Sequence, residues 1–268
     1  MTVVALEGVH ALKHAVRFGA RITEILTDDP GRALATADQV APDIRPLIEQ
    51  ATVLAPTRFR ELSHQPIHTH VLAYAERPAW TLDQALPTAE HPTILLDDPR
   101  NSKNMGAVVR VGAAASAAGL LVNGPADVCD PMAVRGAAGL QWALPWWGSP
   151  DLMAQLDQIR AEAVRPTQLG KSDDPGPSHE HSDNKHGFFR LIGLDAGGTP
   201  FDPTIADPVI FAFGSERTGL SEAVRTRCDE IHSLPMRPHI SSLNLATSVS
   251  AVLYVTLFAR RSLTNNDG

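Results

Sequence analysis

Cysteine and long apolar segments are scarce in this sequence. Its 268 residues include only two cysteines, Cys129 and Cys228, which lie far apart and in no metal-ligand spacing. We therefore expect two reduced thiols, and the count excludes a small secreted domain stapled by disulfides. No apolar run reaches the roughly eighteen residues that mark a transmembrane helix, and the first residues lack the pattern of a signal peptide. These absences predict a cytoplasmic protein without a membrane segment.

An excess of positive charge is also missing, since the formal net charge is -7. This excludes a protein coated with basic residues, although a local basic patch is still compatible with it. Two groups of histidines invite a metal assignment, namely His64, His68 and His70, and then His179, His181 and His186. Their spacings match no zinc pattern, so we expect no metal, only histidines that are solvated or face a nucleic acid. The second group belongs to a polar segment, 165–187, that is predicted to be a loop.

Apolar patterns divide the chain into two α/β units. The first covers residues 1–77, the break at Arg77-Pro78 opens a linker at 78–92, and the second unit covers 93–263. Buried strands alternate with helices in the second unit, which predicts a parallel sheet. The predicted strands are 93–96, 120–122, 141–144, 188–194, 209–213 and 231–234, and the predicted helices include 105–118, capped by Asn104, and one that begins at Ser242.

Polar loops follow two of these strands. Residues 209–213 lead into Gly214-Ser215-Glu216, and residues 231–234 lead into a loop that contains Ser242 and Asn244. Because the carboxyl ends of parallel strands meet at one edge of a sheet, we expect these side chains to lie together. The sequence therefore predicts a ligand site at this edge.

Three stretches stand in a fixed order in the second unit. They read LLDDPRNSKNMGAVVRVGAAASAAGLLV (95–122), FAFGSERTGLS (211–221) and LPMRPHISSLNLATSVSAVL (234–253). Together they resemble the three motifs of the SpoU/TrmH family of RNA ribose 2′-O-methyltransferases, and the resemblance covers residues 93 to 263. Residues 1–77 are similar in pattern to the small substrate-binding domain that precedes many such catalytic domains.

The resemblance implies an α/β fold whose C-terminal segment forms a deep trefoil knot. It also implies S-adenosylmethionine as cofactor, a tRNA or rRNA as substrate, and a homodimer with composite active sites. The residues that match positions assigned to chemistry in the family are Asn104, Arg110, Glu216, Ser242 and Asn244. Those that match cofactor-binding positions are Gly214, Leu234, Met236, Leu243, Asn244 and Leu245. Among the basic residues of the first unit, Lys13, Arg17, Arg21, Arg58 and Arg60 are expected to contact RNA phosphates.

Simpler interpretations of these residues stay open at this point. Asn104 and Ser242 could each be only a helix cap, Glu216 only an acidic residue in a first helical turn, and Arg110 only a surface ion pair. A catalytically inactive RNA-binding relative of the same fold is the alternative function. A nucleotide-binding oxidoreductase is disfavoured, because no Gly-x-Gly-x-x-Gly follows a strand.

Overall fold

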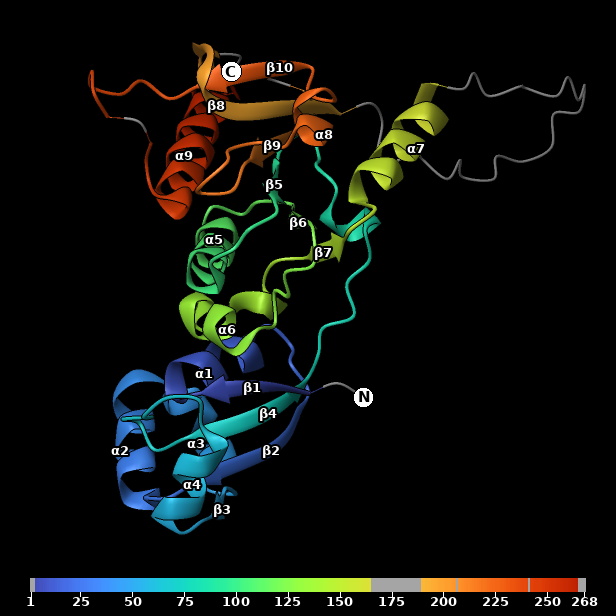
Figure 1. Cartoon of the computed structure of the whole chain (residues 1–268). Helices are drawn as coiled ribbons and strands as arrows, with labels where there is room; N and C mark the ends of the chain where they lie inside the picture. The colour runs from blue at the N-terminus through green and yellow to red at the C-terminus, as the bar shows by residue number, and fades with distance from the viewer. Residues whose placement is uncertain (1–2, 165–188, 206, 241, 265–268) are drawn as a thin grey trace, which may run out of the picture.

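The computed structural model describes residues 3–164, 189–205, 207–240 and 242–264. The predicted loop at 165–187, with its three histidines, lies outside the described residues. Two sheets form two bodies that lie one above the other, and helix α6 lies between them (Figure 1).

The small sheet has four strands in the order β1-β4-β2-β3. Strand β4 pairs antiparallel with β1 and β2, and β2 pairs parallel with β3. The strands are β1 (Val3–Glu7), β2 (Ile22–Thr27), β3 (Thr52–Val53) and β4 (Leu72–Glu76). The helices of this body are α1 (Val9–Arg17), α2 (Pro30–Val40), η1 (Pro42–Ile44), α3 (Arg45–Ile48) and α4 (Pro56–Leu62).

The large sheet has six strands in the order β10-β8-β9-β5-β6-β7, and every pair is parallel, as the sequence predicted. The strands are β5 (Thr93–Asp97), β6 (Gly119–Asn123), β7 (Trp146–Ser149), β8 (Arg190–Pro200), β9 (Val209–Phe213) and β10 (Glu230–Ser233). The helices are α5 (Ser102–Ala114), α6 (Pro131–Ala137), η3 (Leu140–Trp142), α7 (Leu152–Val164), α8 (Glu222–Arg225) and α9 (Leu245–Thr264).

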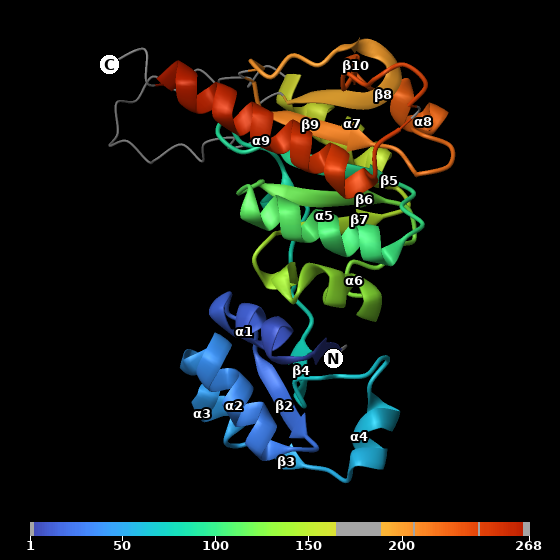
Figure 2. The ribbon, with the colours of Figure 1, turned by 90° about the vertical axis from the view of Figure 1, so that its left-hand side faces the viewer.

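Helices cover both faces of the large sheet. Along β5, Ile94 and Leu96 pack with α5 and α9, whereas Leu95 packs on the other face with α7 and α8. This alternation is why the buried strands are apolar throughout. Figure 2 shows α9 beside α5 on one face, and their N-terminal ends lie at the same edge as α8.

The two bodies are fixed to each other through α1 and α6. A Cβ on Gly139 would lie 2.2 Å from the carbonyl oxygen of Ala11, so the backbones touch there. His14 Nδ1 lies 2.8 Å from the carbonyl oxygen of Ala138. The linker is also packed, because Trp80 Nε1 donates to the carbonyl oxygen of Gln141 at 3.0 Å. The small domain therefore has a defined orientation on the large one.

Some sequence predictions were wrong. Residues 141–144 contain no strand, because the 3-10 turn η3 places Gln141 inward, where its Nε2 donates to Val128, and the strand begins only at Trp146. Strand β1 and helix α2 were not predicted at all. Helix α2 begins at Pro30, in the first turn where proline is favoured, and Asp29 caps it by accepting from Arg32 N.

The two cysteines carry no disulfide, as expected. Burial raises the pKa of Cys129 to about 12 and that of Cys228 to about 11, so both thiols are protonated and unreactive at neutral pH. Across the described residues, no helix is long and apolar enough to cross a membrane, and no three His, Cys, Asp or Glu side chains are grouped as a metal site.

Candidate active site

The candidate site lies at the carboxyl ends of strands β5 and β9. These strands are neighbours, with Leu96 opposite Phe213, so the loops that follow them leave the sheet side by side. The β5 loop leads into α5, whose cap is Asn101: its Oδ1 accepts from the backbone N–H of Lys103 and of Asn104 at 3.0 and 3.2 Å. The prediction of Asn104 as the cap was therefore wrong by one turn, which leaves the Asn104 side chain available for other contacts.

A chain of hydrogen bonds joins the three sequence motifs. Asn104 Nδ2 donates to Glu216 Oε1 at 2.7 Å, and Asn244 Nδ2 donates to Asn104 Oδ1 at 3.2 Å. The Asn104 amide is thus held at both ends, which fixes its orientation. Asn104, Glu216 and Asn244 together form the Asn104 cluster. Of the side chains predicted to meet at this edge, Glu216 and Asn244 are joined through Asn104, although Asn104 and Asn244 are 140 positions apart in the sequence.

The predicted start of the last helix was also wrong. Helix α9 begins at Leu245, and Asn244 Oδ1 accepts from the backbone N–H of Ala246 at 3.0 Å. Asn244 therefore serves the first turn that Ser242 was expected to cap. Ser242 is exposed and lies before the helix.

The loop that carries Glu216 is folded tightly on itself. Ser215 and Gly219 exchange backbone hydrogen bonds of 3.0 Å in both directions. A Cβ on Gly214 would lie 2.0 Å from the backbone carbon of Gly219, so only glycine fits at this position.

Asp97 is a residue that sequence reasoning missed. It is 3% exposed at the end of β5. Its Oδ2 accepts from the backbone N–H of Ser221 at 2.6 Å, and its Oδ1 accepts from Asn123 Nδ2 at 2.7 Å. Asp97 therefore ties the Glu216 loop and the end of β6 to β5. An aspartate closing an otherwise apolar strand was the available signal.

The predicted cofactor residues lie in two segments beside the Asn104 cluster. Gly214 belongs to the Glu216 loop, and the others lie on the path from β10 to α9. Leu234 and Met236 are half-buried, Leu243 is 42% exposed, and Leu245 is buried. Leu243 thus presents an apolar side chain next to Asn244, whereas Leu245 packs into the core.

Arg110 is not brought to the Asn104 cluster within one chain. Six residues of helix place it about 9 Å along the axis and about 240° around it from Asn104. Arg110 is exposed and faces helix α1 of the small domain. The pKa of His10 in α1 is lowered, first by partial burial and then by the positive charges of Lys13 and Arg110.

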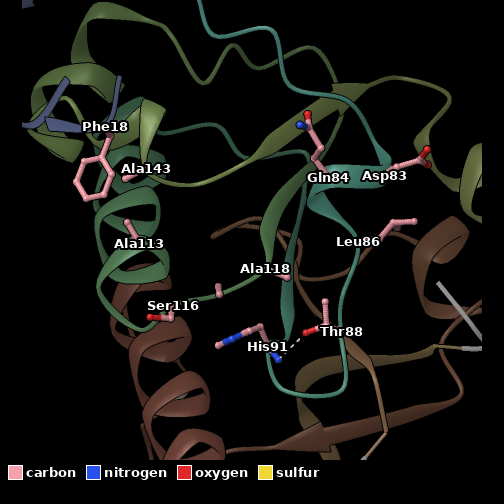
Figure 3. A pocket seen from close by; sticks show the side chains of 11 residues that line it. Phe18, Asp83, Gln84, Leu86, Thr88, His91, Ala113, Ser116, Ala118 and Ala143 are labelled. Atoms are coloured by element: carbon pink, nitrogen blue, oxygen red, sulfur yellow. Dashed lines mark hydrogen bonds between the residues drawn. The ribbon is translucent and has the colours of Figure 1, made fainter. Parts of the chain in front are cut away.

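A cavity of about 650 Å³ lies elsewhere (Figure 3). It opens near the C-terminal end of α5, at Ser116, and near His91 and Thr88 before β5, with Phe18 at its side. These residues precede the strands, so the cavity is at the opposite edge of the sheet from the Asn104 cluster. Size alone does not locate the candidate site here.

One prediction concerns Asn244. Asn244→Ala removes the hydrogen bonds to Asn104 and to the first turn of α9, and we expect the affinity for S-adenosylmethionine to fall about tenfold. Isothermal titration calorimetry measures this directly. Ser262→Ala, an exposed change near the other end of the same helix, is the control, and equal affinities for the two variants would remove Asn244 from the site.

Comparison with known proteins agrees with this geometry. The model of the SpoU rRNA Methylase family matches residues 91–254. A 23S rRNA (uridine(2479)-2'-O)-methyltransferase of Streptomyces viridochromogenes is 29% identical over 259 residues, which cover 95% of this chain and 82% of that protein. An uncharacterized tRNA/rRNA methyltransferase of Mycobacterium bovis is 30% identical over 257 residues, 95% of this chain and 70% of that protein.

A solved structure is similar over the same extent. The SpoU methyltransferase AviRb from Streptomyces viridochromogenes, in complex with AdoMet, superposes with a TM-score of 0.73 at 28% identity, covering 96% of this chain and 90% of that one. The family match spans more than half of the chain and contains all three motifs that meet in the Asn104 cluster. The chain belongs to the SpoU rRNA methylase family.

Proposed function

We propose that this protein transfers the methyl group of S-adenosylmethionine to a ribose 2′-hydroxyl in tRNA or rRNA. The observation that carries the proposal is the Asn104 cluster, which joins all three family motifs at the carboxyl edge of the sheet. The exposed, apolar Leu243 beside Asn244 fits contact with a bound nucleoside cofactor. When bound, the cofactor supplies a methyl group on a positively charged sulfur.

The chain itself supplies orientation and charge. Glu216 and Asn244 hold the Asn104 amide, and Asp97 holds the Glu216 loop, so this edge is organised before substrate arrives. Arg110 is always protonated, so it does not act as a base. We assign to it the stabilisation of negative charge that develops on the 2′-oxygen as its proton leaves, or of the adjacent phosphate.

The experiment that tests the function has two parts. Calorimetry is expected to show binding of S-adenosylmethionine, and purified tRNA or rRNA is expected to gain tritium from the labelled methyl group. A catalytically inactive RNA-binding relative would bind RNA and leave it without tritium. That second outcome would replace the proposed function by the alternative.

We further propose a division of labour in which residues 1–77 bind the RNA and residues 93–263 hold the cofactor and the chemistry. We propose the cytoplasm as the location of the protein, because tRNA and rRNA are found there. Truncation is a poor test of this division, because the buried Val134 of α6 shares one apolar core with Leu6 and Leu12 of the small domain. Point variants on the RNA-binding surface are better suited.

We also propose a homodimer. Val255 and Phe258 of α9 are 46% and 60% exposed, and they present apolar surface three residues apart on this helix. Leu253 of the same helix packs into the chain's own core at 1% exposure. The trefoil knot stays a prediction of the family resemblance.

The dimer yields a second prediction. Phe258→Asp places a charge on the exposed face of α9, and we expect it to convert the dimer into a monomer because burying an unpaired carboxylate is costly. Light scattering at micromolar concentration gives the mass. Val53→Asp, on an equally exposed apolar residue of the small domain, is the control. A monomeric wild-type protein would contradict the dimer.

A further inference from the structure

The small domain has a cavity of its own, of about 270 Å³. It lies between the N-terminus of α2, helix α4 and the segment 63–70. Its lining residues are Arg32, Arg60, His68 and His70, the acidic Asp28, and Phe59, Ser63, Pro66 and Ile67. The cavity thus brings two arginines from different helices to one place.

Three of the five basic residues that were expected to contact RNA form ion pairs with acidic side chains. Arg17 pairs with Asp43 at 2.7 Å, Arg21 with Glu76 at 3.1 Å, and Arg58 with Glu61 at 3.0 Å. These pairs lower the attraction of each arginine for a phosphate. Of the five, only Lys13 and Arg60 make no ion pair with a described acidic residue.

Arg60 is therefore available for a ligand. Its Nε donates to the carbonyl oxygen of Pro56 at 3.2 Å, which anchors the guanidinium along its own helix. Its two terminal nitrogens keep their donors, and the side chain lines the cavity. Arg45 of α3 pairs with Asp38 and Glu49 and does not line the cavity, so it offers a control for a change at Arg60.

Arg32 is held at the rim of the cavity by a short relay. His70 Nδ1 lies 2.8 Å from Asp28 Oδ1, and His70 Nε2 lies 3.4 Å from Arg32 Nη1. Asp28 and His70 are 13% and 19% exposed, whereas Arg32 is 74% exposed. Arg32 also forms an ion pair with Asp29, with its Nε 3.7 Å from Oδ2. The relay orients the guanidinium and leaves donors directed to solvent.

The other residues that line the cavity are suited to contact a nucleobase. Pro66 and His68 are exposed, and Ile67 is half-buried, so the segment offers flat and apolar surfaces for stacking. The volume lies just below the range of about 300 to 1,000 Å³ typical of sites for larger ligands. It suits a single nucleotide.

The cavity also lies in line with the Asn104 cluster. His64, at the start of the same segment, donates its backbone N–H to Glu7 Oε1 at 2.6 Å, and Arg135 of α6 binds the other oxygen of Glu7. Helix α6 in turn touches α5, because a Cβ on Gly106 would lie 2.2 Å from the carbonyl oxygen of Ala133. Figure 2 shows the segment before β4 on the same side of the molecule as α8 and the start of α9.

We propose that this cavity binds one unpaired nucleotide of the RNA substrate, with its phosphate between Arg32 and Arg60 and its base against Pro66, Ile67 and His68. The proposal rests on the proposed function, because it assumes that the substrate is RNA. Planar guanidinium groups match phosphate oxygens in geometry, and single-stranded RNA is recognised through unstacked bases. The cavity then selects a target with an unpaired nucleotide at a fixed distance from the methylated one.

The test is the double variant Arg32→Gln with Arg60→Gln, and Arg45→Gln is its control. The probe is a short fluorescein-labelled oligouridylate, whose binding is measured by fluorescence anisotropy over a series of salt concentrations. We expect the double variant to bind at least about tenfold more weakly and the salt slope to fall by about 0.7, as for the loss of one phosphate contact on a single strand, while the control binds as the wild type does. In methylation of rRNA or tRNA, the KM for RNA should rise at unchanged kcat.

The possible outcomes distinguish a failure of the cavity proposal from a failure of the proposed function. A wild-type protein that methylates RNA, with a double variant that binds and methylates equally well, overturns the cavity proposal. A wild-type protein that transfers no methyl group counts against the proposed function, and the anisotropy series alone then decides the cavity. An unchanged affinity for S-adenosylmethionine shows that the double variant is folded.

Discussion

Replacing Arg110 by alanine is expected to lower methyl transfer to RNA by roughly a hundredfold to a thousandfold, the usual cost of removing one group that stabilises developing charge. Arg110 is exposed on α5, so the variant should fold normally. Affinity for S-adenosylmethionine should be unchanged, because Arg110 lies away from the Asn104 cluster. The measurement is kcat and KM for tritium transfer, and an Arg110→Ala enzyme with wild-type kcat would remove Arg110 from the chemistry.

Co-expression of two variants tests where Arg110 acts. In a dimer of one Arg110→Ala chain and one Asn104→Ala chain, a composite site formed between the two chains keeps both residues once. Activity above that of either variant alone is therefore expected. If Arg110 served the cluster of its own chain, every site in the mixed dimer would lack one residue and no activity would return.

Gly214→Ala is expected to reduce both cofactor affinity and methyl transfer by about a hundredfold, which corresponds to roughly 3 kcal/mol. The added Cβ would lie 2.0 Å from the backbone carbon of Gly219 and 2.2 Å from the backbone nitrogen of Leu220. Backbone atoms cannot rotate away, so the loop must open. When the loop opens, Glu216 moves away from Asn104 and the hydrogen bond between them is lost.

The matched control for this change is Gly31→Ala in helix α2. There the added Cβ meets only the Asp29 side chain, at an ordinary 3.5 Å, and alanine favours a helix by up to about 1 kcal/mol. This variant should bind and methylate as the wild type does. Titration calorimetry and a tritium assay compare the two variants, and a fully active Gly214→Ala enzyme would show that the loop does not need its tight turn.

The sequence allowed the site to be predicted better than its local structure. The family resemblance was sufficient to assign Asn104, Glu216 and Asn244 to one site. The strand order could not be predicted from the sequence: the two polar loops follow β9 and β10, which are separated by β8, and it is the loop after β5 that lies beside the loop after β9. The helix caps were misplaced, since Asn101 and Asn104 have the same side chain and propensity cannot choose between them. The choice depends on Glu216, which is 112 positions away in the sequence and takes the Asn104 amide.

The ion pairs of the small domain are a second feature that could not be predicted from the sequence. The sequence shows that Arg17, Arg21 and Arg58 are basic, but their partners Asp43 and Glu76 are distant in sequence and only the fold brings them near. Only Arg58 and Glu61, three residues apart on one helix, form a pair that spacing alone suggests. The basic surface available to RNA is therefore smaller than the composition indicated. It also lies elsewhere on the small domain than the sequence suggested.

Mapping of methyl groups in RNA is the sharpest test of the proposed function. Total tRNA and rRNA from cells that lack this protein are incubated with the purified protein and S-adenosylmethionine, digested, and analysed by mass spectrometry. We expect one new methyl group on a ribose, at a nucleotide whose 3′ phosphodiester then resists alkaline hydrolysis. A methyl group on a base, or no new methyl group in either RNA, would contradict the proposed function.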